Sequence, residues 1–154
     1  MNTKVEYLVV YPRVDRPDNC YVDPERTIRG NLNICCDSWK TNTAIRMGFC
    51  DLIYAGFGNH PGLHDGNPNM PFDSGDAGVN HAHDFWAKAR IRSMSIGDLI
   101  CIDPHGMSEW WLCDNVGFVI LSDDEVTSWL NFPRKYGCDM FEVKQWMKEE
   151  GLDK

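Results

Sequence analysis

The chain has 154 residues and a mass of 17.7 kDa, which fits a single domain over residues 1–154. Its composition, 43% hydrophobic and 25% charged, is close to that of ordinary globular proteins and argues against disorder throughout. Asp and Glu outnumber Lys and Arg by 23 to 15, which gives a net charge of −8 and disfavours direct nucleic-acid binding through a basic surface. Because the sequence holds neither a membrane-length apolar run nor the apolar segment of an export signal, we expect a cytoplasmic protein that does not bind membranes.

Two strands and a helix are predicted before a long loop. Residues 5–11 (VEYLVVY) are β-branched and aromatic and predict a strand that Pro12 ends. A turn at 15–19 and a short strand at 20–22 follow. A helix is expected from a cap at Asp37 or Ser38 to about Ala55, because four apolar residues recur on one helical face, namely Ile45, Phe49, Leu52 and Ile53.

Residues 56–79 are rich in Gly, Asn and Pro and predict a loop, since such a composition sustains neither a helix nor a strand. Loops of this length in compact domains are usually functional or mobile.

The second half predicts a hairpin followed by two helices. Strands are expected at 98–103 and 110–113, with a third at 118–121. A capping box at 122–125 begins one helix, and a second helix follows Asp139 and ends at Gly151. The fold class is therefore α+β: a small antiparallel sheet with a hairpin in the C-terminal half, packed by about three to four helices. We expect a core at 1–121 and a helical extension at 122–154.

The negative charge is concentrated in two tracts that hold no Lys or Arg. Residues 47–87 carry five Asp, and residues 93–133 carry seven acidic side chains. One interpretation is that these acids lie on solvated turns and helix starts and aid solubility. The other is an acidic surface that binds a basic partner protein, possibly a nucleic-acid-binding one. Its predicted binding residues are Asp65, Asp73, Asp76, Asp123, Asp124 and Glu125.

Trp110 and Trp111 are adjacent on a predicted strand and therefore face opposite sides of the sheet. One is expected in the core, and the other is a candidate for a contact surface. Trp129 and Trp146 lie on the predicted C-terminal helices, which could also cover both members of the pair.

Chemistry at a metal or a thiol is the alternative to binding. Four of the five histidines, His60, His64, His81 and His83, lie near Asp65 and Asp84, a set that suits a metal-binding protein or a metal-dependent enzyme. Asp65, Asp73 and Asp76 also fit a twelve-residue calcium loop, but Met70 occupies its Gly position and Asp76 its Glu position. The seven cysteines form no CxxC pair, and Cys101 and Cys113 are expected to be buried. With nucleophile motifs absent, we expect a protein that is not an enzyme and holds no cofactor or metal.

Three segments resemble the YodL-like domain, a small domain of bacterial and mobile-element proteins. They are residues 80–85 (NHAHDF), 92–100 (RSMSIGDLI) and 110–118 (WWLCDNVGF), and the similarity extends over about residues 80–121. Ala82 replaces the usual Pro, and the Trp pair replaces the usual Tyr pair. The resemblance implies a protein of phages, plasmids or integrative elements, often encoded beside anti-restriction genes, without an established enzymatic activity.

Taken together, these observations predict a non-enzymatic binding protein of phage or mobile-element origin. It would use its acidic surface to inhibit or adapt a basic host protein, as in anti-restriction or anti-CRISPR action. A small structural subunit of a phage assembly is a further possibility that the sequence leaves open.

Overall fold

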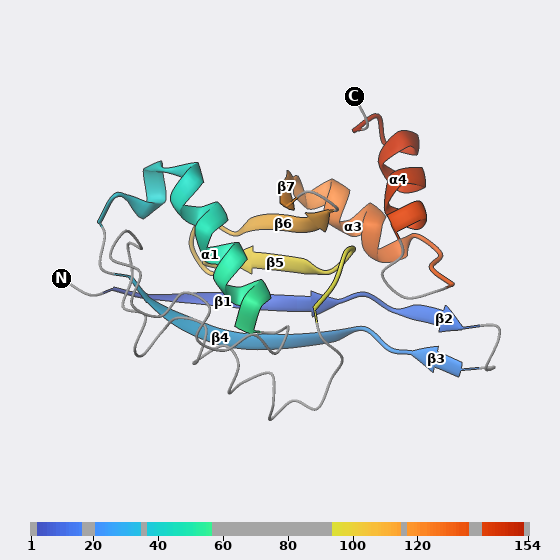
Figure 1. Ribbon diagram of the computed structural model, residues 1–154, viewed down its shortest axis with the longest axis horizontal. Coiled ribbons are helices and arrows are strands. Elements are labelled where there is room, and N and C mark those ends of the chain that lie inside the picture. The colour runs from blue at the N-terminus through green and yellow to red at the C-terminus, as the bar shows by residue number, and fades with distance from the viewer. Residues whose placement is uncertain are drawn as a thin grey trace.

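The computed structural model describes residues 3–16, 21–34, 37–56, 94–114, 117–135 and 140–152. These residues form an α+β fold with a five-stranded antiparallel sheet in the order β4-β1-β5-β6-β7 (Figure 1). The elements are β1 (Thr3–Tyr11), β2 (Val14–Arg16), β3 (Tyr21–Asp23), β4 (Arg26–Ile34), the 3-10 helix η2 (Asp37–Thr41), α1 (Thr43–Gly56), β5 (Leu99–Ile102), β6 (Glu109–Asp114), β7 (Gly117–Leu121), α3 (Asp123–Asn131) and α4 (Met140–Glu149). The predicted mixed fold and the hairpin of the second half are confirmed at this level.

The first four strands belong to one long hairpin that two prolines interrupt. β1 pairs with β4 and β2 pairs with β3 in a single continuous register, in which Tyr11 faces Arg26 and Val14 faces Asp23. Pro12 and Pro24 occupy the gap, and a proline has no backbone N–H to donate to the ladder. As a result, β2 and β3 form an arm that projects beyond the sheet (Figure 1).

This hairpin corrects two sequence-based expectations. The turn predicted from residue 15 is wrong at its start, because Asp15 lies within β2 and pairs with Val22. The long strand β4 was not predicted, although Ile28, Leu32 and Ile34 alternate with polar residues along it. Its polar side chains lie on the outer face of an edge strand, where a half-buried alternation is expected.

The two faces of the sheet bury separate clusters. Tyr7 and Val9 of β1 pack on the first face with Phe49 of α1, because alternate residues of a strand point to opposite faces. On the second face, Val10 packs with Trp129 of α3 and with residues of α4. The helices α3 and α4 thus share a core with the strands, whereas the sequence suggested an extension.

The helix predicted from residue 37 is divided in two. A short 3-10 helix covers Asp37–Thr41, and α1 begins at Thr43. The cap is Asn42, whose Oδ1 accepts from the N–H groups of Ala44 at 3.0 Å and Ile45 at 3.3 Å. Asp37 and Ser38 therefore do not cap α1.

Gly97 controls how the chain enters β5. The Asp98 N–H donates to Ser95 O at 3.1 Å, and Gly97 has a φ of 94°, as the third residue of a type II turn requires. Gly97 and Asp98 together face Cys113: the Gly97 N–H donates to Cys113 O at 2.8 Å, and the Cys113 N–H donates to Asp98 O at 2.9 Å. This is a β-bulge that places Gly97 at a positive φ, a conformation that glycine adopts without strain.

The predicted capping box at the start of α3 is confirmed. The Glu125 N–H donates to Ser122 Oγ at 3.2 Å, and Glu125 Oε1 accepts from the Ser122 N–H at 2.7 Å. The rings of Trp129 and Trp146 lie 5.2 Å apart, and Trp129 Nε1 donates to Gly97 O at 2.7 Å. The helices are therefore joined both to each other and to the turn before β5.

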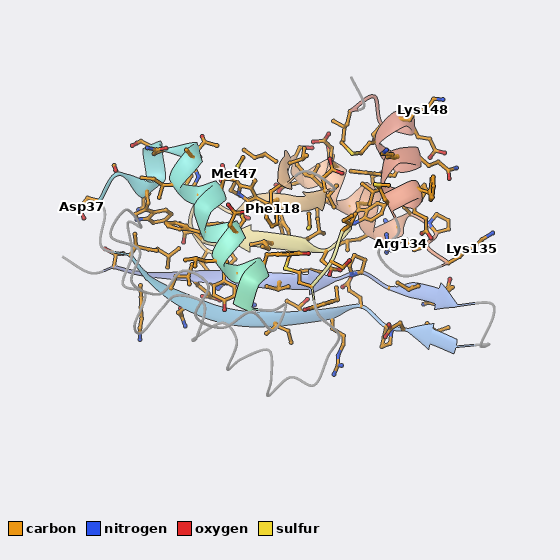
Figure 2. The ribbon with its side chains drawn as sticks, viewed as in Figure 1. Asp37, Met47, Phe118, Arg134, Lys135 and Lys148 are labelled. Atoms are coloured by element: carbon orange, nitrogen blue, oxygen red, sulfur yellow. The ribbon has the colours of Figure 1, made fainter. Side chains whose placement is uncertain are left out.

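Arg134 ties the arm to the C-terminal helices (Figure 2). Its buried guanidinium donates to the carbonyls of Trp129 and Leu130 at the end of α3 and, at 2.9 Å, to Arg13 O between β1 and β2. The Asp15 N–H in turn donates to Arg134 O at 2.9 Å. One side chain thus satisfies helix-end carbonyls and fixes the base of the arm.

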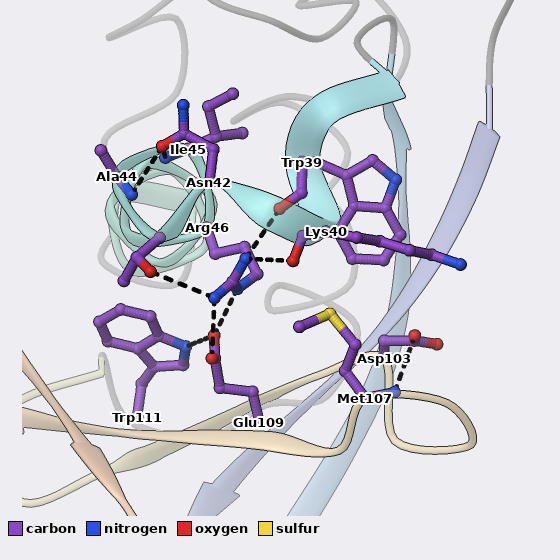
Figure 3. Close-up of polar contacts among 11 residues, drawn as sticks. Trp39, Lys40, Asn42, Ala44, Ile45, Arg46, Asp103, Met107, Glu109 and Trp111 are labelled. Carbon is purple, nitrogen blue, oxygen red and sulfur yellow. Dashed lines mark hydrogen bonds and ion pairs between the residues drawn. The ribbon is translucent and has the colours of Figure 1, made fainter.

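A buried ion pair joins α1 to β6 (Figure 3). Arg46 donates to both carboxylate oxygens of Glu109, at 2.7 and 3.1 Å, and the side chains are only 7% and 14% exposed. The same guanidinium donates to the carbonyls of Trp39 and Lys40 at the end of η2, and Trp111 Nε1 donates to Glu109 Oε1 at 2.9 Å. The guanidinium and the carboxylate of this pair hydrogen-bond to groups of η2, α1 and β6. The pair therefore fixes α1 on the sheet.

Within the described ranges, no helix combines the length and apolarity needed to cross a membrane.

Candidate binding site between α1 and β7

A cavity of about 250 Å³ lies where α1 passes over the ends of β6 and β7. The helix contributes Asp51 and Tyr54, and Phe118 of β7 lies beneath α1 (Figure 2). Among the described residues, the lining consists of Asp51, Tyr54, Ile96, Cys113, Asp114, Gly117 and Phe118. The cavity therefore combines two carboxylates with two aromatic rings, and none of these seven residues is basic.

The aromatic part of the lining is accessible. The rings of Tyr54 and Phe118 meet edge to face, with centroids 6.2 Å apart and an interplanar angle of 79°. Tyr54 remains 37% exposed, so its ring can contact a bound group. Gly117 has a φ of 137°, a backbone conformation that favours glycine at the rim of the cavity.

The electrostatic field in the cavity is negative. Burial, together with smaller contributions from the carboxylates of Asp98, Asp114 and Asp51, raises the pKa of the Cys113 thiol to about 12. Burial, Cys113 and Asp98 likewise raise the pKa of Tyr54. Asp98 is fully buried, and its Oδ2 accepts from the Ser95 N–H at 2.8 Å. Negative charge that disfavours ionisation of the Cys113 thiol also attracts a cation to the cavity.

The raised thiol pKa values predict inert cysteines at Cys50, Cys101 and Cys113. Burial is the main cause at each, and it raises the pKa of Cys101 to about 11. Because the thiolate is the reactive form, these three should react with iodoacetamide at pH 8 at least tenfold more slowly than in urea. Peptide mass mapping measures the difference. The stability that comes from these neutral thiols is fully present below the unfolded pKa near 9. It decreases as the pH rises above that value and is completely lost once the pH has passed the folded values.

The predicted acidic residues of α3 lie away from this cavity. Asp123 and Asp124 are exposed in the first turn of α3, and Glu125 is half-buried because it completes the capping box. The cavity lies at the Gly117 end of β7, whereas α3 follows its Leu121 end. Three further predicted residues, Asp65, Asp73 and Asp76, lie outside the described residues.

The tryptophan pair divides as the alternation of a strand requires. Trp111 is buried in the first-face cluster and is therefore not available as an exposed contact. Trp110 is half-buried on the second face against the cluster that contains α3 and α4. The structure thus supports the structural interpretation of Trp111 and leaves only part of Trp110 exposed.

The second acidic tract does not form one surface. Glu109 is paired with Arg46, and Asp98 is buried. Asp103 accepts from the Met107 N–H at 3.0 Å with its side chain, and it has a φ of 55° within the tight turn. Asp114 and the acidic residues at the start of α3 lie at opposite ends of β7.

The described part of the chain contains no cluster of three or more metal-binding side chains. The histidines at 60, 64, 81 and 83 and the calcium-like register lie outside it, so the alternative of a metal site stays a prediction. Cys101 and Cys113 are buried, as predicted.

Sequence reasoning missed the residues that line the cavity. Asp51 and Tyr54 come from one element and Asp114 and Phe118 from two others, and only the packing of α1 on the hairpin brings them together. A usable signal was present: Asp51 and Tyr54 are polar residues beside the apolar face of the predicted helix, three positions apart and hence on one side.

The chain matches no protein-family model, no curated protein and no solved structure.

Proposed function

We propose that the protein is a non-enzymatic binding protein that recognises a basic group of a partner protein in the cavity between α1 and β7. The observation that supports this best is the lining itself, in which the carboxylates of Asp51 and Asp114 flank the Tyr54–Phe118 pair. A guanidinium group fits such a lining, because its edge donates to carboxylates while its flat faces pack on aromatic rings.

The negative field supports the same proposal. Three carboxylates raise the pKa of Cys113, so their charges act together on a residue of the cavity lining. A net charge of −8 would also accelerate association with a basic surface and make it sensitive to salt.

In its biological setting, we propose that the partner is a basic host protein, and that binding inhibits or adapts it. The resemblance to the YodL-like domain favours an anti-defence role in a phage or mobile element, with anti-restriction and anti-CRISPR action as specific forms.

A paired set of variants tests the cavity. Asp51→Asn with Asp114→Asn removes two charges from the lining, and we expect binding of an arginine-containing peptide to weaken at least tenfold at 0.1 M salt. Titration calorimetry against that peptide and against its citrulline counterpart measures the effect, since citrulline keeps the shape and removes the charge.

The matched control is Asp123→Asn with Asp124→Asn, which removes the same charge from the first turn of α3. It should leave the affinity for the peptide within about twofold of the wild-type value. These exposed charges lie at the opposite end of β7 from the cavity, and salt largely screens them. If the α3 variant weakened binding and the cavity variant did not, the acidic turn would be the site and our proposal would be wrong. Circular dichroism and thermal melting confirm that both variants are folded.

A further inference from the structure

We infer that the outer edge of β7 pairs with an extended strand of the basic partner, which extends the sheet and directs one cationic side chain into the cavity. This inference rests on the proposed function, because the partner's charge is taken from it. β7 is the last strand in the order β4-β1-β5-β6-β7, and no described strand pairs with its outer side. Addition of a strand to such an edge is a recurrent mode of peptide recognition.

The backbone hydrogen bonds show which groups of β7 point outward. The N–H and C=O of Cys113 are engaged with the β5 side, at Asp98 and Gly97. Cys113 and its cross-strand neighbour Phe118 therefore form a non-hydrogen-bonded pair. The backbone N–H and C=O groups of Gly117, Val119 and Leu121 point toward β6. The N–H and C=O groups of Phe118 and Ile120 consequently face outward.

The two edges of the sheet differ in protection. β4, the opposite edge, carries exposed Arg26 and Arg29 and an exposed Asn31. Charged side chains at an edge are a common device against unwanted pairing. β7 has the sequence GFVIL, with no charged residue and no proline. An edge strand whose own residues lack these protecting features, beside an acidic cavity, is the arrangement expected of a strand-binding site.

The side chains beside this edge define what the added strand should carry. Ile120 is 45% exposed and points to the same face as Phe118. Met47, which is 39% exposed, shares one side of α1 with Asp51 and Tyr54 at i, i+4 and i+7. A strand with a basic residue opposite Phe118 and an apolar residue opposite Ile120 would place the charge at the cavity and the apolar group on Ile120.

The test uses a capped seven-residue peptide in which Val, Arg and Val alternate with Thr, together with its citrulline counterpart. Amide hydrogen exchange of the full chain is followed by NMR with and without the peptide. In the free protein, the amides of Phe118 and Ile120 should exchange at least tenfold faster than those of Val119 and Leu121. With the arginine peptide bound, the two outward amides should become at least tenfold slower.

Two variants at one position separate backbone pairing from side-chain contact. Ile120→Pro removes the outward N–H, which an edge strand tolerates, and should weaken peptide binding at least tenfold. Ile120→Thr keeps the N–H and should weaken it only a few-fold. Equal effects of the two variants would contradict strand pairing.

The outcomes distinguish this inference from the proposed function. Resonance shifts at Asp51 and Tyr54 without protection of the Phe118 and Ile120 amides would overturn strand addition and leave the cationic cavity intact. Protection by the citrulline peptide equal to that by the arginine peptide would overturn the cavity's charge preference and leave strand addition intact. Protection that rises with protein concentration in the absence of peptide would identify a second copy of the chain as the occupant and overturn the proposal. No shift at millimolar peptide would overturn both.

Discussion

Glu109→Gln is expected to lower the free energy of unfolding by about 3–5 kcal/mol, which is the cost of leaving one member of a buried ion pair without its counter-charge. Arg46 is almost fully buried and holds Glu109 through two nitrogens, at 2.7 and 3.1 Å. The substitution preserves the shape of the side chain, so the loss reports charge and not packing. Urea denaturation followed by tryptophan fluorescence gives the value.

Two comparisons define the meaning of that loss. Replacing both partners, with Arg46→Met and Glu109→Leu, leaves no buried charge, although the carbonyls of Trp39 and Lys40 and the Nε1 of Trp111 lose these partners. The double change should therefore cost less than the sum of the two single losses. Glu6→Gln removes one partner of the exposed Arg29–Glu6 pair and should cost less than about 1 kcal/mol. A Glu109→Gln loss as small as that of Glu6→Gln would show that water reaches the Arg46 guanidinium.

Arg134→Met is expected to lower the free energy of unfolding by about 3 kcal/mol, since hydrogen bonds from a charged donor contribute about 1.5–3 kcal/mol each and not all are fully lost. The carbonyls of Trp129, Leu130 and Arg13 would lose their shared donor. The guanidinium also lies 4.7 Å from the Trp129 ring centroid, in a cation–π contact. The thioether of Met would replace this contact only in part.

The effect of Arg134 should also be visible locally. The amide of Asp15, which donates to Arg134 O, should exchange faster in Arg134→Met because the base of the arm is loosened. Lys135→Met is the matched control, as it removes a neighbouring exposed charge and should change stability by less than about 0.5 kcal/mol. An unchanged Asp15 amide in Arg134→Met would mean that the arm is held by its own strand pairing.

Local patterns in the sequence predicted most of the described elements. The strand at 5–11 and the capping box at 122–125 are confirmed because they depend on neighbouring residues: β-branched side chains in one case and reciprocal side-chain-to-backbone bonds in the other. β4 was missed because Gly30 and its asparagines disfavour an isolated strand, whereas pairing with β1 along its full length supplies its backbone partners. The helix divides before Thr43 because Asn42 caps α1. The sequence alone did not identify this cap, because Asp37 and Ser38 are also residues that commonly cap helices.

Local sequence patterns did not predict the candidate site. The acidic tract at 93–133 predicted a surface, but the fold uses Asp98, Asp103 and Glu109 internally. The cavity depends instead on Asp51 and Asp114, which come from different tracts and meet only through packing of α1 on β6 and β7. Charge counts along a sequence do not distinguish a carboxylate that stabilises a turn from one that faces a partner.

The strand order has a consequence for how quickly this chain folds. Each side of the sheet is built from sequence neighbours: β1 with β4 on one side and β5 with β6 and β7 on the other. These hairpins can form on a microsecond scale, whereas the seam between them pairs Tyr7 with Ile102 across most of the chain. Pairing between strands that are distant in the sequence slows folding. It lowers stability only slightly, because each doubling of the length of the intervening chain costs only about 0.6 kcal/mol. The joining of β1 to β5 is therefore the step expected to limit the folding rate.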